Sequence, residues 1–241
     1  MEEIILLILE IVGTIAFAVS GAFVAIKAKL DVFGVLFVGC ITAVGGGITR
    51  DLLMGCTPPA IFSNLYILLI AAVTSAVVFV LSYIKRKRFH EIERRIEHIN
   101  NVFDACGLAA FSVMGTQVAF AEGFGGNAVF AVLMGMLTGV FGGVYRDILT
   151  ATTPYIFKKH VYALASIGGA TVYYVLRRCI GGDNGTLIAS IVAMALVVTI
   201  RMLAAKYRWS LPKVHLDEEA SAENTQDRPQ AESKEESQPL S

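Results

Sequence analysis

Seven long stretches of this sequence are almost free of charged residues, and each is long enough to cross a lipid bilayer as a helix. A helix that crosses about 30 Å of hydrocarbon needs roughly 20 mostly apolar residues. The stretches cover residues 4–26, 32–49 with an apolar continuation to 55, 65–84, 102–121, 123–145, 161–176 and 186–200. Because they are continuously apolar rather than alternating, they predict transmembrane α-helices and not the strands of a barrel. The expected fold is an all-α membrane protein with seven spans.

The composition agrees with a protein that lies in a lipid bilayer. Hydrophobic residues make up 55% of the chain and charged residues 17%, whereas soluble domains carry about 25% charged residues. The sequence therefore argues against a soluble globular domain and against a nucleic-acid-binding protein. The four cysteines are scattered without a CxxC pair, and no histidine stands at metal-ligand spacing, so we expect no disulfide scaffold, metal or cofactor.

No pattern typical of an enzyme is present in the sequence. A Ser/His/Asp set, HExxH and the phosphate-binding GxxxxGK[ST] are all lacking. The triple glycine at 45–47 interrupts an apolar span rather than following a strand, so it does not resemble a nucleotide-binding loop. We therefore expect a membrane protein without enzymatic activity.

The distribution of basic residues predicts the orientation in a cell inner (plasma) membrane. Six basic residues follow the third span: Lys85, Arg86, Lys87, Arg88, Arg94 and Arg95. Lysine and arginine in short loops favour the cytoplasmic side. The N-terminus is then outside and the C-terminus cytoplasmic, with Arg177 and Arg178 as exceptions on the outer side.

The last residues are acidic and polar. Positions 217–241 hold eight acidic residues against Arg228 and Lys234, a net charge of −6. Such a segment has too little apolar surface to fold, so we expect a disordered tail, and a solvated terminus is favoured over a regulatory element.

An internal repeat carries the strongest information about architecture. Residues 10–21 and 104–115 share the pattern acid-x-x-Gly-x-x-x-Phe-x-x-x-Gly at an offset of 94. Further identities follow at an offset of 96: Gly39/Gly135, Gly46/Gly142, Gly47/Gly143, Arg50/Arg146, Asp51/Asp147, Thr57/Thr153, Pro58/Pro154 and Tyr66/Tyr162. A two-residue insertion between the two groups reconciles the offsets, so the chain contains two copies of one unit.

Each copy contains three spans, so the second copy enters the membrane from the opposite side. This is the inverted repeat of many transporters, with a seventh helix added. The predicted parts are a first three-helix repeat at 1–84, a basic cytoplasmic loop at 85–101, a second, inverted three-helix repeat at 102–178, a seventh helix at 184–204 and a disordered acidic tail at 212–241.

The two copies of the acidic element, followed by GGG-x-x-RD at 45–51 and FGG-x-x-RD at 141–147, resemble the prokaryotic trimeric intracellular cation (TRIC) channel family. The resemblance covers residues 10 to about 200. It implies seven helices, with the second and fifth bent at the glycines, and a homotrimer with one monovalent-cation pore in each protomer. Phe141 departs from the family pattern, because a second glycine triplet is expected there.

Glycines in the middle of a helix are costly, at about 1 kcal/mol each relative to alanine. Their duplication favours a bend that exposes backbone carbonyls to a water-filled path, and close packing of small residues is the alternative. The predicted pore or substrate path consists of Gly45, Gly46, Gly47, Thr49, Arg50, Asp51, Thr138, Gly142, Gly143, Arg146 and Asp147.

Charged residues within the spans are expected to pair or to face water. Successive helix positions point about 100° apart, which favours pairing of Arg50 and Arg146 with Glu10 or Asp104 rather than with the adjacent aspartates. We expect these four to form a buried charge network at the repeat interface. A structural network and direct contact with the permeating ion both stay open.

The predicted function is a monovalent-cation channel, with K⁺ as the ion. The alternative is a transporter of glycine or another small neutral solute that uses the same repeat interface. Tyr66 and Tyr162 are interpreted as anchors at the membrane interface.

Overall fold

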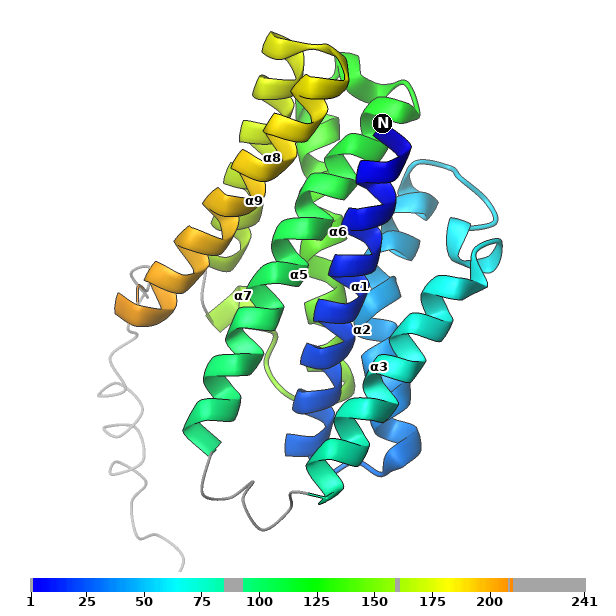
Figure 1. The fold of residues 1–241 in the computed structure, drawn as a ribbon, viewed down its shortest axis with the longest axis vertical. Coiled ribbons are helices and arrows are strands. Elements are labelled where there is room, and N and C mark those ends of the chain that lie inside the picture. The colour runs from blue at the N-terminus through cyan, green and yellow to red at the C-terminus, as the bar shows by residue number, and fades with distance from the viewer. Residues whose placement is uncertain (1, 85–92, 159–160, 208, 210–241) are drawn as a thin grey trace, which may run out of the picture. The chain divides into compact units, whose positions relative to one another are not determined.

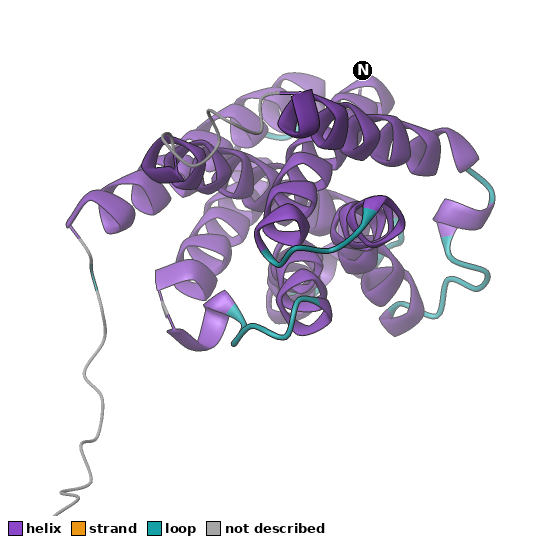
Figure 2. Cartoon of the chain, turned by 90° about the horizontal axis from the view of Figure 1, so that it is seen from below, coloured by secondary structure: helices purple, strands orange, loops and turns teal. Residues whose placement is uncertain are grey.

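The computed structural model describes residues 2–84, 93–158, 161–207 and 209, and helices dominate this part of the chain. Figure 1 shows seven long helices: α1 (Glu2–Lys27), α2 (Val32–Leu53), α3 (Leu65–Ile84), α5 (Glu93–Ala121), α6 (Ala128–Leu149), α8 (Val161–Ile180) and α9 (Gly182–Tyr207). Three short elements join them: η1 (Ala60–Phe62), η2 (Phe124–Gly126) and α7 (Tyr155–Lys158). No strand occurs among the described residues, as the view from below shows (Figure 2). The predicted all-α class is confirmed.

Two predicted segments fall partly or wholly outside this description. Most of the basic stretch, 85–92, and the acidic tail, 212–241, lie outside the described residues. The remainder of the segment expected as a loop belongs to α5, which begins at Glu93.

Six of the long helices are apolar enough to cross a membrane, namely α1, α2, α3, residues 97–121 of α5, α6 and residues 184–207 of α9. α8 has the same length as α3 but includes Gly168, Gly169, Arg177 and Arg178, which lower its hydropathy. It packs against α9 and α6. All seven predicted helices are therefore present, and α8 is the least apolar of them.

The exposed side of α3 is apolar along its length. Leu69, Val73, Val77 and Val80 are all more than half exposed and recur every three or four residues, which places them on one face of the helix. Such a face is stable in a lipid environment and costly in water, so the surface of the bundle agrees with a membrane protein.

The two halves begin their second helices in the same way. Asp31 caps α2 by accepting a hydrogen bond from the Gly34 amide at 2.8 Å, and Asn127 caps α6 by accepting one from the Phe130 amide at 3.1 Å. The fifth span was expected to begin at residue 123. That start was wrong, because Gly123 has a φ of 86° and leads into η2 before the Asn127 cap.

The equivalent helices of the two halves run in opposite directions. In Figure 1, α1 descends, α2 ascends and α3 descends, whereas α5 ascends, α6 descends and α8 ascends. α9 follows as a further descending helix. The odd number of helices in each half thus produces the inverted repeat that the sequence predicts.

The halves meet through reciprocal contacts between α1 and α5. The rings of Phe17 and Phe111 lie 5.3 Å apart, centroid to centroid. Each ring covers a glycine of the other helix, since a Cβ at Gly107 would overlap Phe17 and a Cβ at Gly13 would overlap Phe111. Because both pairs are equivalent positions of the repeat, a pseudo-two-fold axis passes between the two rings.

A second reciprocal contact joins α2 and α6. A Cβ at Gly46 would overlap the Thr138 carbonyl oxygen, and a Cβ at Gly142 would overlap the Thr42 carbonyl oxygen. These two contacts also exchange under the repeat. The glycines therefore allow two helix backbones to cross in direct contact on the pseudo-two-fold axis.

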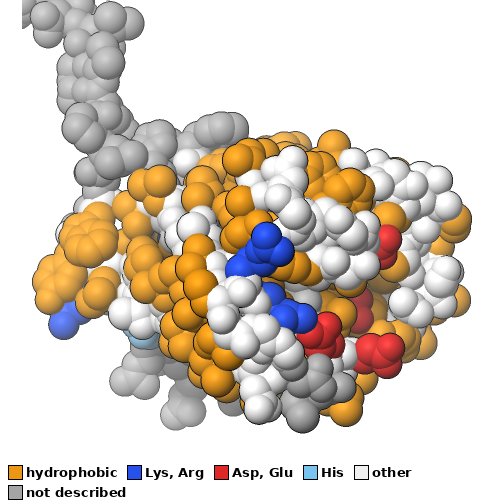
Figure 3. Space-filling view, turned by 90° about the horizontal axis from the view of Figure 1, so that it is seen from above, with side chains coloured by type: hydrophobic (Ala, Val, Ile, Leu, Met, Phe, Trp, Pro, Cys, Tyr) orange, Lys and Arg blue, Asp and Glu red, His pale blue; other side chains and the backbone are white. Residues whose placement is uncertain are grey.

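The upper face of the bundle carries acidic and basic side chains close together, with apolar side chains around them (Figure 3). At this end Glu2 of α1 accepts hydrogen bonds from Arg177 of α8 and from Thr186 of α9. Arg177, an exception in the predicted charge distribution, is thus neutralised by a neighbouring carboxylate.

Candidate functional site

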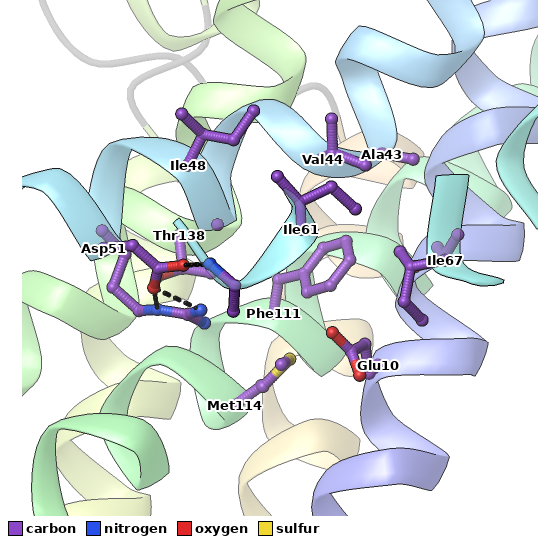
Figure 4. A pocket seen from close by; sticks show the side chains of 14 residues that line it. Glu10, Ala43, Val44, Ile48, Asp51, Ile61, Ile67, Phe111, Met114 and Thr138 are labelled. Carbon is purple, nitrogen blue, oxygen red and sulfur yellow. Dashed lines mark hydrogen bonds and ion pairs between the residues drawn. The ribbon is translucent and has the colours of Figure 1, made fainter. Parts of the chain in front are cut away.

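A small cavity lies in the first half of the molecule, beside the crossing of α2 and α6. Most of its lining comes from α1, α2, η1 and α3 of the first half, and three residues come from α5 and α6 of the second half. The lining residues are Glu10, Thr14, Ala43, Val44, Gly47, Ile48, Arg50, Asp51, Ala60, Ile61, Ile67, Phe111, Met114 and Thr138. Figure 4 shows Asp51 at one side of the cavity and Glu10 at the other, with Met114 and Phe111 between them. The cavity volume of about 40 Å³ is room for roughly two to four water molecules.

Arg50 binds its neighbour Asp51 in this cavity. Its Nε and Nη2 donate to the same carboxylate oxygen at 2.9 and 2.7 Å, and both side chains are buried. The other Asp51 oxygen accepts from the Ala60 amide at 2.9 Å, which ties η1 to the end of α2. Pairing of adjacent residues was not expected from the helix geometry. It occurs because the long arginine side chain turns back across the next position.

The remaining polar groups of the cavity are incompletely bonded. Among the described residues, Arg50 Nη1 and the Thr14 hydroxyl have no hydrogen-bond partner, although both atoms are buried. Glu10 accepts one hydrogen bond, from the Tyr66 hydroxyl at 3.1 Å. The expected pairing of Arg50 with Glu10 was wrong, because Asp51 takes two of the guanidinium nitrogens and tyrosine takes the carboxylate.

The equivalent arginine of the second half has three hydrogen-bond partners. Arg146 donates from Nε to Asp147 at 2.8 Å and from Nη1 to Asp104 at 2.7 Å and to the Ser20 hydroxyl at 2.6 Å. Asp147 also accepts from the Tyr155 amide at 2.8 Å. The expected pairing of Arg146 with Asp104 is present, whereas Arg50 and Glu10 bind other residues, so one pair of the predicted network of four is formed.

A further arginine, which the repeat does not contain, belongs to the second-half network. Arg201 of α9 donates from Nη2 to the second oxygen of Asp104 at 3.1 Å. Its guanidinium carbon lies 4.5 Å from the ring centroid of Tyr162 and 5.4 Å from that of Tyr155. Arg201 lies within the predicted seventh helix, 184–204, but just beyond the uncharged stretch that ends at residue 200, and α9 has no counterpart in the repeat, so neither pattern marked it.

Tyr162 and Tyr66 serve the charged groups rather than the membrane surface. Tyr162 is 1% exposed beneath Arg201, so its expected place at the membrane interface was wrong. Tyr66 is exposed at the surface of α3 but binds Glu10. The duplicated tyrosine thus binds the duplicated acid in the first half only, since the Tyr162 hydroxyl has no hydrogen-bond partner among the described residues.

The glycines do not interrupt their helices. α2 is continuous through Gly45–Gly47 and α6 through Gly142 and Gly143. Gly46 and Gly142 form the backbone crossing, and Gly45 is covered by the ring of Tyr145. Gly47 alone of the triplet faces the cavity, where a Cβ would approach only Arg50, at 3.9 Å.

A hydrogen bond joins the two halves just beyond the crossing. The hydroxyls of Thr49 and Tyr145, which are equivalent positions of the repeat, lie 2.9 Å apart. Thr49 donates to the Gly45 carbonyl oxygen at 2.9 Å, so it accepts from Tyr145. The pair places a polar contact on the pseudo-two-fold axis.

The family model described as "Glycine transporter" matches the chain twice, at residues 7–83 and 101–178, once in each half. The chain is 37% identical to the UPF0126 inner membrane protein YadS of Escherichia coli K12, over 87% of this chain and 96% of the relative. It is 33% identical to the UPF0126 membrane protein YvgT of Bacillus subtilis, over 85% and 94%. The chain belongs to the UPF0126 family.

Solved structures place this UPF0126 protein among TRIC channels. A structure that concerns conductance through TRIC cation channels is 33% identical, with a TM-score of 0.73, and covers 87% of this chain and 97% of its own. A prokaryotic TRIC channel in 0.5 M KCl is 32% identical, with a TM-score of 0.75, and covers 87% and 100%. The TRIC orthologue of Rhodobacter sphaeroides is 27% identical, with a TM-score of 0.74, and covers 85% and 98%. The resemblance inferred from the repeated motifs is confirmed, and none of these proteins is named as an enzyme.

In this UPF0126 protein, the predicted path residues divide into three groups. Gly47, Arg50, Asp51 and Thr138 line the cavity together with Glu10. A second group forms the crossing on the axis: Gly45, Gly46, Thr49 and Gly142. Arg146 and Asp147 belong to the charge network around Asp104, and Gly143 faces the Tyr162 hydroxyl of that network.

Proposed function

We propose that this protein is a channel for monovalent cations, with K⁺ as the principal ion. It acts in the inner membrane as a homotrimer with one pore in each protomer. The observation that carries the proposal is the likeness to solved TRIC channels over 85–87% of the chain, at 27–33% identity.

The chemistry of the first-half cavity supports cation passage. Arg50 and Asp51 cancel each other in formal charge, which leaves the carboxylate of Glu10 as the excess charge of the lining. The hydroxyls of Thr14 and Thr138 add oxygen atoms at the same cavity. Carboxylate, hydroxyl and carbonyl oxygens replace the water that an ion loses in a narrow pore.

The proposed path passes this cavity and the glycine crossing. Gly47 leaves room beside Arg50, and the Thr49–Tyr145 hydrogen bond closes the α2–α6 contact nearby. In this closed arrangement the cavity has space for a few waters, so conduction requires α2 and α6 to separate at the crossing. The reciprocal glycine contacts are the surface along which they separate.

Reconstituted single-channel recording tests the proposal. We expect unitary currents in a KCl gradient whose reversal potential follows K⁺. Saturable uptake of labelled glycine without such currents would instead support the alternative that the family description suggests. Glu10→Gln is expected to reduce the preference for K⁺ over Cl⁻, whereas Glu122→Gln, on the exposed loop before η2, is the matched control and leaves it unchanged. A mass of three chains for the protein in detergent tests the homotrimer.

The orientation is a separate part of the proposal, with the N-terminus outside and the C-terminus cytoplasmic. Reporter fusions after Arg88 and after Glu122 lie on either side of one span and should report opposite compartments, with Arg88 cytoplasmic. Agreement between the two reporters would contradict the topology.

A further inference from the structure

Asp104 is bound by two arginines, one from inside the repeat and one from outside it. Its Oδ1 accepts from Arg146 at 2.7 Å and its Oδ2 from Arg201 at 3.1 Å, and all three side chains are about 95% buried. Arg201 lies on α9, the helix that has no counterpart in the first half. The seventh helix therefore adds one cation to a site that the repeat alone would leave acidic.

The arginine from α9 changes the net formal charge of the second-half site. Each half contributes two carboxylates and one arginine at equivalent positions, namely Glu10, Arg50 and Asp51 in the first half and their counterparts in the second. Each set has a net charge of −1. Arg201 brings the second set to neutrality, and no corresponding arginine reaches Glu10 among the described residues.

The surroundings of Arg201 are those of a bound cation. Its guanidinium group lies over the faces of Tyr162 and Tyr155 and against the Asp104 carboxylate. The negative face of an aromatic ring and a buried carboxylate both attract cations of any kind, whether or not these are attached to the chain. If the side chain were shortened, the same groups would line a space that is acidic and aromatic.

We propose that Arg201 is a built-in counter-ion that occupies the second-half equivalent of the cation site at Glu10, and that removal of its side chain turns Asp104 into a binding site for a small monovalent cation. The proposal rests on the proposed function for the choice of K⁺ as the ion. It follows that the wild-type protein binds permeating cations in one half, although its sequence encodes an acidic site in both.

The test measures cation-dependent stability of the purified full-length protein, so it does not depend on conduction. Arg201→Ala is compared with wild type by thermal unfolding in KCl and in N-methyl-D-glucamine chloride at equal ionic strength. In N-methyl-D-glucamine chloride, we expect the Tm of the variant to be several degrees below that of wild type, because the buried Asp104 carboxylate has lost a partner. In KCl, or with millimolar guanidinium added to the organic salt, it should recover at least half of that loss, because a ligand that binds only the folded state stabilises it.

Two controls separate an ion site from a merely structural arginine. Arg177→Ala removes an arginine that is also ion-paired and tests whether any such loss gives the same salt effect. Asp104→Asn combined with Arg201→Ala removes both charges, so the recovery in KCl should vanish. An equal Tm loss in both salts, or a recovery that persists without the Asp104 carboxylate, would overturn the proposal.

Whether the variants fold also distinguishes an exchangeable counter-ion from an arginine that is needed for packing. If Arg201→Ala cannot be purified, the double variant should still fold, because Arg146 keeps Asp147 as its partner. Failure of both variants would mean that Arg201 is needed for packing, which contradicts a counter-ion that can be exchanged. Cation-specific recovery without channel currents would leave this inference standing and reject the proposed function.

Discussion

Arg50 and Arg146 occupy equivalent positions of the repeat, yet their surroundings differ. Arg50 binds Asp51 alone and leaves one nitrogen unbonded beside a cavity. Arg146 binds Asp147, Asp104 and Ser20. The packing of the two halves, by contrast, is reciprocal at the glycines. Duplication of a sequence has thus preserved the helix crossings while the charged groups have diverged.

The difference comes from residues outside the repeated pattern. Ser20 is replaced by Met114 at the equivalent position of the second half, and α9 contributes Arg201 to one half only. Asp104 in the second half binds two arginines, whereas Glu10 in the first half binds Tyr66 beside a cavity that is available to a ligand.

The charge network should make the second half far more sensitive to loss of its arginine. Arg146→Leu leaves two buried carboxylates with fewer partners, which costs about 3–5 kcal/mol for a truly buried pair. Arg50→Leu should cost less, because Arg50 is paired with one carboxylate and Arg146 with two. Unfolding in detergent measures both.

A double-mutant cycle then tests which groups touch. Arg146→Leu with Asp104→Leu should cost less than the sum of the single changes, by about 0.5–3 kcal/mol. Arg50→Leu with Glu10→Leu should be additive, because the structure shows no bond between them. Additivity in both cycles would mean that the second-half network does not exist as described.

The glycine crossing should show the opposite result, namely equal effects in the two halves. Gly46→Ala and Gly142→Ala each force a Cβ against a backbone carbonyl, and such overpacking costs about 1–3 kcal/mol. Gly47→Ala is the matched control, since only Arg50 lies near its added methyl group, and it should be neutral or gain up to about 1 kcal/mol.

The same variants test the conduction path. Gly46→Ala and Gly142→Ala should impair flux more than trimer assembly if the crossing must open. Lost assembly with normal unitary currents in the surviving trimers would show that these glycines serve packing alone.

The hydrogen bond on the axis is expected to have a smaller effect. Tyr145→Phe removes the donor to Thr49 and should cost about 1 kcal/mol, the usual net value of such a bond. If α2 and α6 separate during opening, the variant should also raise the open probability in single-channel recording. A lower open probability would exclude this bond as a contact of the closed state.

Glu10→Gln should change stability least, because the amide oxygen still accepts from Tyr66. We expect less than about 0.5 kcal/mol in unfolding, together with a clear loss of K⁺ preference over Cl⁻. Asp104→Asn should show the reverse, with a large loss of stability and little change in selectivity. Equal behaviour of the two acids would remove the functional distinction between the halves.

The sequence predicted the helices well because apolar length decides them. The third helix agrees at both ends with the predicted 65–84, and α2 begins at the predicted residue. The start of α6 was missed because apolar character begins at Gly123, whereas the backbone turns there and the cap stands at Asn127. Hydropathy detects the span and local backbone geometry sets its end.

The partners of the charged groups were less predictable. The repeat identified Arg50, Arg146, Glu10 and Asp104 as a set, but which of them pair depends on side-chain reach and on neighbouring helices. Arg201 could not be found from the repeat, because it comes from the unduplicated helix. The glycines were recognised as exceptional, but the sequence could not distinguish a broken helix from a close crossing.

The contact of Tyr145 with Gly45 shows how the two halves differ at the pseudo-two-fold axis. Two identical three-helix chains in opposite orientations would place the same residue on both sides of the axis, as Phe17 and Phe111 still do. A tyrosine at both 49 and 145 would need a glycine at both 45 and 141, yet residue 141 is phenylalanine. The large ring of Tyr145 therefore lies against Gly45, which has no side chain. At the equivalent positions of the repeat, the large residue is Phe141 and the small one is Thr49. Because both halves lie in one chain, positions 49 and 145 can differ, and the compensating pair of Gly45 and Tyr145 occurs on one side of the axis only.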